Sequence, residues 1–444
     1  MDNKNVKKMI LILISTIFFI MSCQTIDEDN GLDSLQLLQE DFQQLRTALE
    51  NNHPSIYLYD SEETMDALFD KTYNSIQTDF SELQFHRILA PMIARVRCGH
   101  TSIFLSPEVL ESIGNNGSGF PYGVSVIDGH SYIYQNYSQY TSIPLGTELL
   151  SINQRSIPSI IDTMLSSISS DGYNVTLKFD RIKNQFSRLY YYFIDTPDTF
   201  EIECVFPGET DPRLITIDAV SASEIGASYT EKNNPDELFT YRIIENSSTA
   251  LLTISSFIIA DFPDYVSFFR TSFQDMIDKN VKDLIIDVRG NGGGDPEFSS
   301  ELIRYFIDHP ITYFAVGIAY PNLFQPIPPH DIHFGGNVYV LIDGGCFSTT
   351  GHFCSLMQYH HLVTFIGEET GGSFYCNDNS NLITLRNSQL WANIARTTFE
   401  TAVEGYTKGR GIMPDHEVKQ SLQDQINGSD AVMQYTLNLI SGNI

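Results

Sequence analysis

"NVYVLIDGGCFSTTGH", residues Asn337 to His352, joins an apolar run of strand length to a segment with helical spacing. One serine, Ser348, stands at the junction, just after a pair of glycines and two further residues. Serine is a common helix N-cap, because its hydroxyl accepts a hydrogen bond from a backbone N–H of the first turn. A sharp strand-to-helix turn also presents a hydroxyl beside the next backbone N–H, as in nucleophile elbows. This stretch alone is compatible with both interpretations of Ser348.

A second junction of the same kind is "DLIIDVRGNGGGD", residues Asp283 to Asp295. It does not fit the dinucleotide-binding pattern G-x-G-x-x-G, because Asp295 occupies the place of the last glycine, and no phosphate-binding lysine is present. Gly292 and Gly293 instead indicate a loop with bare backbone N–H groups at a helix start, where negative charge is stabilised. A tight turn that binds nothing is the alternative.

Around these junctions, residues 223–444 alternate short apolar runs with helical patterns, which predicts an α/β core. Residues 32–116 carry apolar positions at helical spacing and predict an N-terminal helical domain. Residues 117–222 alternate with period two and predict a compact, mostly β domain. Its segment "IPLGTELLSINQRSI" resembles the glycine-led strand of PDZ domains, which bind extended peptides by strand addition, although any small β domain can contain such a segment. We therefore expect an α/β fold class in a multi-domain α+β chain.

Composition excludes several classes of partner. The 444 residues are 42% hydrophobic and carry a formal net charge of −29, which describes an acidic globular protein. An acidic surface repels phosphate backbones, so nucleic acid is not an expected partner. Five cysteines follow Cys23, without a CxxC pair or a His/Cys cluster at zinc spacing. No metal site is expected, and buried apolar cysteines are favoured over disulfides, with one bridge left open.

The N-terminus predicts export. Residues 1–22 combine a lysine-containing start with the apolar run "MILILISTIFFIM", the pattern of a signal peptide. The run ends in "IMSC", which resembles a bacterial lipobox, so we expect Cys23 to receive lipid and residues 23–31 to form an acidic tether. This predicts a lipid-anchored protein of the bacterial cell envelope, with the outer membrane favoured. An ordinary signal peptide is the alternative.

Four motifs occur in a fixed order: "LIIDVRGNGGG", "VYVLIDGGCFSTTG", "IGEETGG" and "GRGIMPDHEV". Together they resemble the catalytic core of tail-specific, or C-terminal processing, serine peptidases and of the tricorn core peptidase. The resemblance implies a crotonase/ClpP-like core in which Ser348 is the nucleophile. It also implies an oxyanion hole built from the N–H of Thr349 and from Gly292 or Gly293.

The resemblance also bears on the general base. Processing peptidases use a lysine after the strand that follows the nucleophile, and this chain has none there. The tricorn branch takes a histidine from a segment like "GHTSIF", so His100 is the expected base for Ser348. Cys98 stands where an aspartate is often found, and Lys408 stands where relatives carry an acidic residue. The acid that orients His100 is thus unassigned, since Glu404 is near only in sequence.

Two functional hypotheses follow. In the first, the protein is a lipid-anchored serine peptidase that acts on peptides or unfolded protein segments and needs no metal or organic cofactor. In the second, it is a binding lipoprotein of the same fold without turnover. The missing acid favours the second hypothesis, whereas Ser348, His100 and the glycine loop favour the first.

Overall fold

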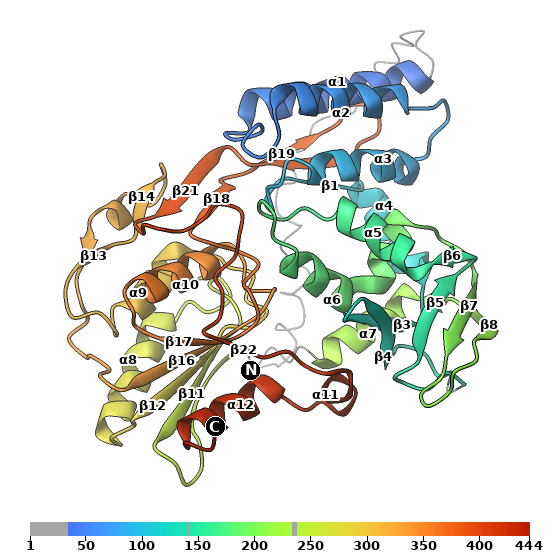
Figure 1. The fold of residues 1–444 in the computed structure, drawn as a ribbon. Helices are drawn as coiled ribbons and strands as arrows, with labels where there is room; N and C mark the ends of the chain where they lie inside the picture. The colour runs from blue at the N-terminus through green and yellow to red at the C-terminus, as the bar shows by residue number, and fades with distance from the viewer. Residues whose placement is uncertain (1–33, 141, 233–237) are drawn as a thin grey trace, which may run out of the picture.

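The computed structural model describes residues 34–140, 142–232 and 238–444. The predicted signal peptide, Cys23 and the whole of the predicted tether therefore lie outside the described residues. Figure 1 shows three regions: a helical region at the top, a mixed region on the right and a larger layered region on the left. Within the described ranges, no helix is long and apolar enough to cross a lipid bilayer.

The layered region is built on a six-stranded sheet with the order β10-β11-β12-β16-β17-β22. Only β10 and β11 pair antiparallel, and the other neighbours are parallel. Leu252, Ile286 and Val340 lie side by side across the three central strands. The strands are β10 (Phe239–Ile243), β11 (Thr249–Ile254), β12 (Asp283–Asp287), β16 (Asn337–Ile342), β17 (Thr364–Gly367) and β22 (His416–Glu417).

Both faces of this sheet are covered, which explains the continuous apolar runs of its strands. Successive side chains of a strand point to opposite faces, so Leu284 and Ile286 pack in one core and Ile285 in the other. The first core contains α8 (Tyr265–Asp278), α9 (Pro296–Ile303) and α10 (Thr349–Tyr359), and the second contains α12 (Ala431–Ile440), which follows α11 (Leu422–Asn427). The predicted α/β core is confirmed.

Smaller sheets extend this core. β14 and β18 flank β21 in a three-stranded antiparallel sheet, and β13 pairs with β15. These elements are β13 (Ile311–Thr312), β14 (Phe314–Val316), the 3-10 helix η3 (Pro321–Phe324), β15 (Pro326–Ile327), β18 (Tyr375–Asp378) and β21 (Thr397–Thr401).

The N-terminal helical region is completed by residues from the far end of the chain. β1 (Ser102–Phe104) pairs with β20 (Trp391–Ile394), which pairs with β19 (Asn381–Thr384). Leu385 and Leu390 are fully buried in the core of the helical region, and Figure 1 shows β19 beside these helices. The helices are α1 (Ser34–Asn52), α2 (Glu62–Asn74), α3 (Glu82–Ala94) and α4 (Pro107–Asn116). A pattern local to residues 32–116 gives no sign of this long-range contribution.

The mixed region contains more helix than its period-two alternation suggested. Its main sheet has the order β3-β4-β5-β7-β8, with β6 beside β5, and a separate pair joins β2 to β9. Phe186 and Tyr190 of α6 pack on Phe120 and Phe200. The strands are β2 (Ser118–Gly119), β3 (Tyr122–Ile127), β4 (His130–Asn136), β5 (Glu148–Ile152), β6 (Arg155–Ser156), β7 (Thr199–Val205), β8 (Arg213–Asp218) and β9 (Val220–Ser221), and the helices are α5 (Ile157–Ser167), α6 (Thr176–Phe193) and α7 (Ala222–Lys232).

Three buried histidines predict a pH-dependent stability. Burial lowers the pKa of His53 and of His86 to about 4, and burial together with His100 lowers the pKa of His352 to about 3. An unfolded imidazole takes up a proton near pH 6.5, whereas these folded ones resist protonation. The unfolding free energy should therefore decrease on acidification from about pH 6.5 to 4, by up to about 1.4 kcal/mol per pH unit for each histidine.

Urea unfolding at several pH values measures this slope. His86→Gln keeps a donor for the Ile103 carbonyl, which lies 3.2 Å from Nε2 of His86, but cannot titrate. The variant should show a shallower decrease than the wild-type protein, and equal slopes would contradict the assignment.

Candidate active site

Ser348 lies at the sharp turn between β16 and α10, as the sequence predicts. Its backbone has φ 55° and ψ −124°, a conformation that costs energy for any residue other than glycine. Ser348 holds the N-cap position of α10, yet its side chain makes no capping hydrogen bond. The geometry therefore argues against the helix-cap interpretation and matches the strained elbow that exposes a nucleophile.

The glycine loop after β12 packs directly on this elbow, because parallel strands bring their carboxyl ends to one edge of the sheet. The N–H of Phe347 donates to the Asn291 carbonyl at 3.0 Å, and the Thr350 hydroxyl donates to the Asn291 side chain at 2.8 Å. In the opposite direction, the Gly290 N–H donates to Asp343 Oδ1 at 2.8 Å. Asn291 and Asp343 thus hold the two loops in fixed register.

Gly293 fits this contact only as glycine. It has φ 101°, and an added Cβ would lie 2.7 Å from Ser348 Cβ and 2.9 Å from the Thr349 nitrogen. The N–H of Gly293 donates to Asn291 Oδ1 at 2.9 Å. The Thr349 hydroxyl donates to the Gly294 carbonyl at 2.5 Å. Of the residues predicted for an oxyanion hole, Gly293 and Thr349 therefore lie against Ser348, and Gly292 directly precedes Gly293 in the same loop.

His100 reaches Ser348 from the helical region, although the two are far apart in sequence. Its Nε2 lies 3.0 Å from Ser348 Oγ, and its ring stacks on Phe347 with centroids 4.7 Å apart. The His100 carbonyl accepts hydrogen bonds from Asn393 Nδ2 at 2.9 Å and Ser380 Oγ at 3.3 Å. The same C-terminal segment that completes the helical core thus also fixes the backbone of His100.

Two carboxylates near His100 were missed from the sequence. Asp378 Oδ2, at the end of β18, lies 3.7 Å from His100 Nε2, and its side chain is 42% exposed. Asp171, between α5 and α6, is buried and accepts a hydrogen bond from the Gly99 N–H at 2.7 Å. No sequence motif marks either residue. Of the positions considered earlier, Lys408 pairs with Glu400 at 3.0 Å and Glu404 is exposed.

The second histidine near the elbow has a structural role. His352 is buried in α10, and its Nε2 lies 3.4 Å from Cys376 Sγ rather than at Ser348. Its pKa of about 3 keeps it neutral at physiological pH. The cysteines at positions 98, 204, 346, 354 and 376 are all buried and unpaired, as small apolar side chains would be.

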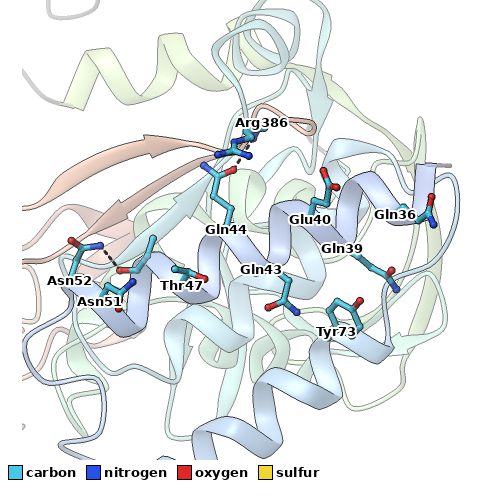
Figure 2. Close-up of a pocket in the computed structure, with 11 residues that line it drawn as sticks. Gln36, Gln39, Glu40, Gln43, Gln44, Thr47, Asn51, Asn52, Tyr73 and Arg386 are labelled. Atoms are coloured by element: carbon cyan, nitrogen blue, oxygen red, sulfur yellow. Dashed lines mark hydrogen bonds between the residues drawn. The ribbon is translucent and has the colours of Figure 1, made fainter. Parts of the chain in front are cut away.

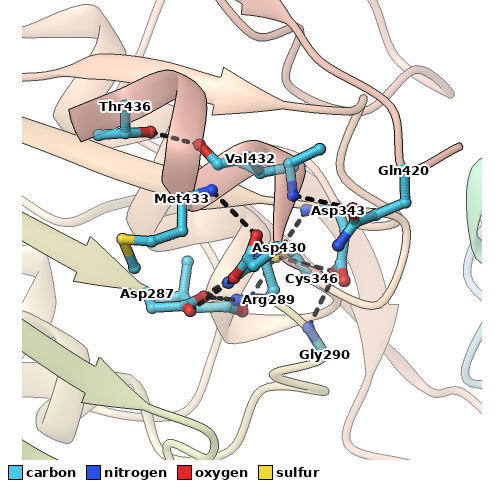
Figure 3. A network of polar contacts seen from close by, with 12 residues as sticks. Asp287, Arg289, Gly290, Asp343, Cys346, Gln420, Asp430, Val432, Met433 and Thr436 are labelled. Atoms are coloured by element: carbon cyan, nitrogen blue, oxygen red, sulfur yellow. Dashed lines mark hydrogen bonds and ion pairs between the residues drawn. The ribbon is translucent and has the colours of Figure 1, made fainter. Parts of the chain in front are cut away.

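An ion-pair network fixes the glycine loop to the opposite face of the sheet. Arg289 donates to both carboxylate oxygens of Asp287, at 2.9 and 2.6 Å, and to both of Asp430, at 2.8 and 2.7 Å. Asp430 also caps α12 by accepting from the Met433 N–H (Figure 3). Bidentate contacts on both sides leave the Arg289 guanidinium little freedom, so the loop begins from a rigid base.

The hollow of about 790 Å³ along α1 lies apart from this chemistry. Its lining consists mainly of glutamine and asparagine side chains with Arg386 and Tyr73 (Figure 2). It contains none of the residues predicted for the active site. The candidate active site is therefore the junction of Ser348, His100 and the glycine loop.

Comparison with known proteins agrees with this fold. Residues 248–418 match the model of peptidase family S41. Mature CPAF has 13% sequence identity and a TM-score of 0.68, with 91% of this chain and 96% of that chain covered. Its complex with lactacystin has 14% identity and a TM-score of 0.69, with 92% and 99% covered. The photosystem II D1 C-terminal processing protease has 14% identity and a TM-score of 0.45, with 89% and 98% covered. No curated protein matches the chain by sequence.

The match covers the strands of the sheet from β11 to β22, the glycine loop and the serine elbow, and it identifies the class of protein as a serine-type peptidase. Residues 248–418, less than half of the chain, carry the likeness to peptidase family S41. At these identities, the likeness to CPAF shows a shared fold.

Gly293→Ala tests the packing of the glycine loop. The substitution forces an L-residue into a positive φ and places Cβ against Ser348, so it should lower the unfolding free energy by about 1–3 kcal/mol and abolish peptidase activity. Gly114→Ala is the matched control, because no atom lies within 4 Å of its added Cβ and the site is helical. Its stability should be unchanged or slightly higher. Wild-type stability and activity in Gly293→Ala would contradict the described contact.

Proposed function

We propose that this protein hydrolyses peptide bonds with Ser348 as nucleophile and His100 as general base. The observation that carries the proposal is the 3.0 Å contact between His100 Nε2 and Ser348 Oγ at an elbow where the serine caps nothing. An imidazole titrates near neutral pH, so it can both remove and return a proton.

The reaction follows from the positions of these groups. Ser348 Oγ attacks the scissile carbonyl carbon while His100 Nε2 takes its proton, and the carbonyl oxygen becomes an oxyanion. The Gly293 N–H already donates to Asn291, so we assign the oxyanion to the N–H groups of Thr349 and Gly292. His100 then protonates the departing amine, and water attacks the acyl-enzyme by the same route in reverse.

The substrate is proposed to be an extended peptide or an unfolded protein segment. The region that contains β3–β8 is proposed to act as a PDZ-like peptide-binding domain, on the basis of the glycine-led segment that enters β5. Strand addition suits an extended chain, because the sheet edge pairs with backbone groups that every peptide carries.

We further propose that Cys23 carries lipid and holds the peptidase at the bacterial cell envelope, with the outer membrane favoured. The support lies in the sequence of residues 1–31, where a signal peptide ends in "IMSC" and an acidic stretch follows. Such a tether separates the folded protein from the membrane surface.

The Ser348→Ala variant tests whether Ser348 acts as a nucleophile or as a helix cap. With the protein that lacks residues 1–23 and casein as substrate, hydrolysis should fall by about 10⁴-fold or more, while stability stays near wild type. Ser81→Ala is the matched control, because Ser81 forms a capping box at the start of α3. It should lose about 1 kcal/mol of stability and keep its activity.

His100→Ala should reduce hydrolysis to a similar level as Ser348→Ala, since the two residues act as a unit. Hydrolysis that persists in Ser348→Ala would refute the assigned nucleophile. A folded wild-type protein that never hydrolyses peptides would favour the binding lipoprotein instead.

Cys23→Ala tests the anchor in the full-length chain. The variant should incorporate no radiolabelled palmitate and should leave the membrane fraction, because the acceptor thiol is gone. Ser22→Ala keeps a small residue before the cysteine and should behave as the wild type. Equal palmitate labelling of Cys23→Ala and the wild-type protein would contradict the proposal.

A further inference from the structure

The Nδ1 atom of His100, on the side of the ring that faces away from Ser348, lacks a hydrogen-bond acceptor among the described residues. For Nε2 to accept the serine proton, the neutral imidazole must carry its own proton on Nδ1. Nδ1 is buried and has no hydrogen-bond partner among the residues that the structure describes. A buried N–H without an acceptor is destabilising.

A matching acceptor is present nearby. Asp171 Oδ2 is buried and likewise has no partner within the described parts of the chain, whereas Asp171 Oδ1 accepts from the Gly99 N–H, one residue before His100. Asp171 and His100 are also close enough for their charges to interact, with the ring nitrogens of His100 more than 4.0 Å from the Asp171 carboxylate oxygens. We propose that Asp171 is the positioning residue of His100, with Oδ2 accepting the Nδ1 proton once a small shift of the two side chains brings them into contact. This inference rests on the proposed peptidase mechanism.

The backbone holds Asp171 in this place from two sides. The Gly172 N–H donates to the Arg97 carbonyl at 2.9 Å, and the Tyr173 N–H donates to the Gly409 carbonyl at 2.8 Å. Gly172 has φ 57°, and a Cβ there would lie 2.1 Å from Gly409 Cα. The segment after α5 is thus fixed against the turn that carries His100, so the mixed region contributes directly to the active site.

Asp378 is the competing carboxylate, and its geometry suits the role less well. Its Oδ2 lies 3.7 Å from Nε2, the nitrogen that contacts Ser348, so it competes with the serine and cannot hold Nδ1. Its side chain is 42% exposed, and water screens its charge. Asp171 is buried, where a charge acts more strongly on its neighbours.

The surroundings of Asp171 set its charge. Burial raises the pKa of the Asp171 carboxyl, whereas His100, the Gly99 N–H and Arg181 lower it and Asp378 raises it. The titratable or charged groups that act on Asp171 or feel its charge are His100, Arg181, Asp378, Tyr59, Cys98 and Cys376. A carboxyl whose folded pKa is raised destabilises the fold as pH rises above its unfolded value. Asp171→Asn should therefore not lower the melting temperature at pH 7.

Asp171→Asn separates a positioning role from a structural one. The amide oxygen still accepts the Gly99 N–H, whereas the amide NH2 takes the place of Oδ2, so the charge and the acceptor for Nδ1 are removed together. At pH 7, kcat/KM for casein should fall by between about tenfold and 10⁴-fold. The acid limb of the pH profile should move to lower pH by about one unit, because the imidazolium loses its anion. The melting temperature should be unchanged or higher.

Asp41→Asn is the matched control. Asp41 is also buried and accepts backbone N–H bonds, from Asn387 at 2.9 Å and Ser388 at 2.6 Å, but it lies in α1. Its replacement should lower the melting temperature and leave the acid limb in place. If Asp171→Asn behaves like this control, or if Asp378→Asn alone shifts the acid limb, the inference is overturned.

A measurement on the wild-type protein needs no variant of Asp171. Nitrogen-15 NMR of the His100 ring, assigned by its disappearance in His100→Gln, reports which nitrogen carries the proton. The inference predicts the Nδ1–H tautomer, and the Nε2–H tautomer would overturn it. An active wild type with an unaffected Asp171→Asn overturns this inference alone, whereas an inactive wild type overturns the proposed function and this inference with it.

Discussion

The structure depends on the contact between two loops at the carboxyl ends of β12 and β16. Asn291 accepts hydrogen bonds from Phe347 and Thr350, and Asp343 accepts one from Gly290. Neither loop can therefore move without the other. The close approach of Gly293 to Ser348 keeps the serine in a strained conformation that an isolated helix start would not adopt. The buried sheet beneath, and Arg289 at the start of the glycine loop, provide the rigidity that this strain requires.

The remaining groups of the site come from other parts of the chain. His100 follows the helices of the N-terminal region, and its backbone is held by residues that belong to the C-terminal part. Asp171 comes from the region that contains β3–β8. The active site therefore forms only when three regions are packed together, so the orientation of each region bears on catalysis.

The sequence predicted the structural features that neighbouring residues determine and those that lie in the four ordered motifs. The α/β core was expected from alternating apolar runs and helical patterns, and the elbow at Ser348 and the glycine loop each lie within one strand-to-helix junction. His100 was expected as the base from the segment "GHTSIF". The hairpin of β19 and β20 was not predicted, because its contact with the helical region joins residues 293 positions apart, as the Asn393 to His100 hydrogen bond illustrates. Asp171 and Asp378 were missed for the same reason, since tertiary packing alone brings them to His100.

The central claim is that Ser348 is an activated nucleophile. Treatment of the protein that lacks residues 1–23 with a fluorophosphonate, followed by peptide mass mapping, tests it directly, because such probes form a stable bond only with an activated hydroxyl. We predict a single phosphonate adduct on the peptide that contains Ser348. A folded protein that stays unlabelled, or an adduct on another serine, would contradict the claim.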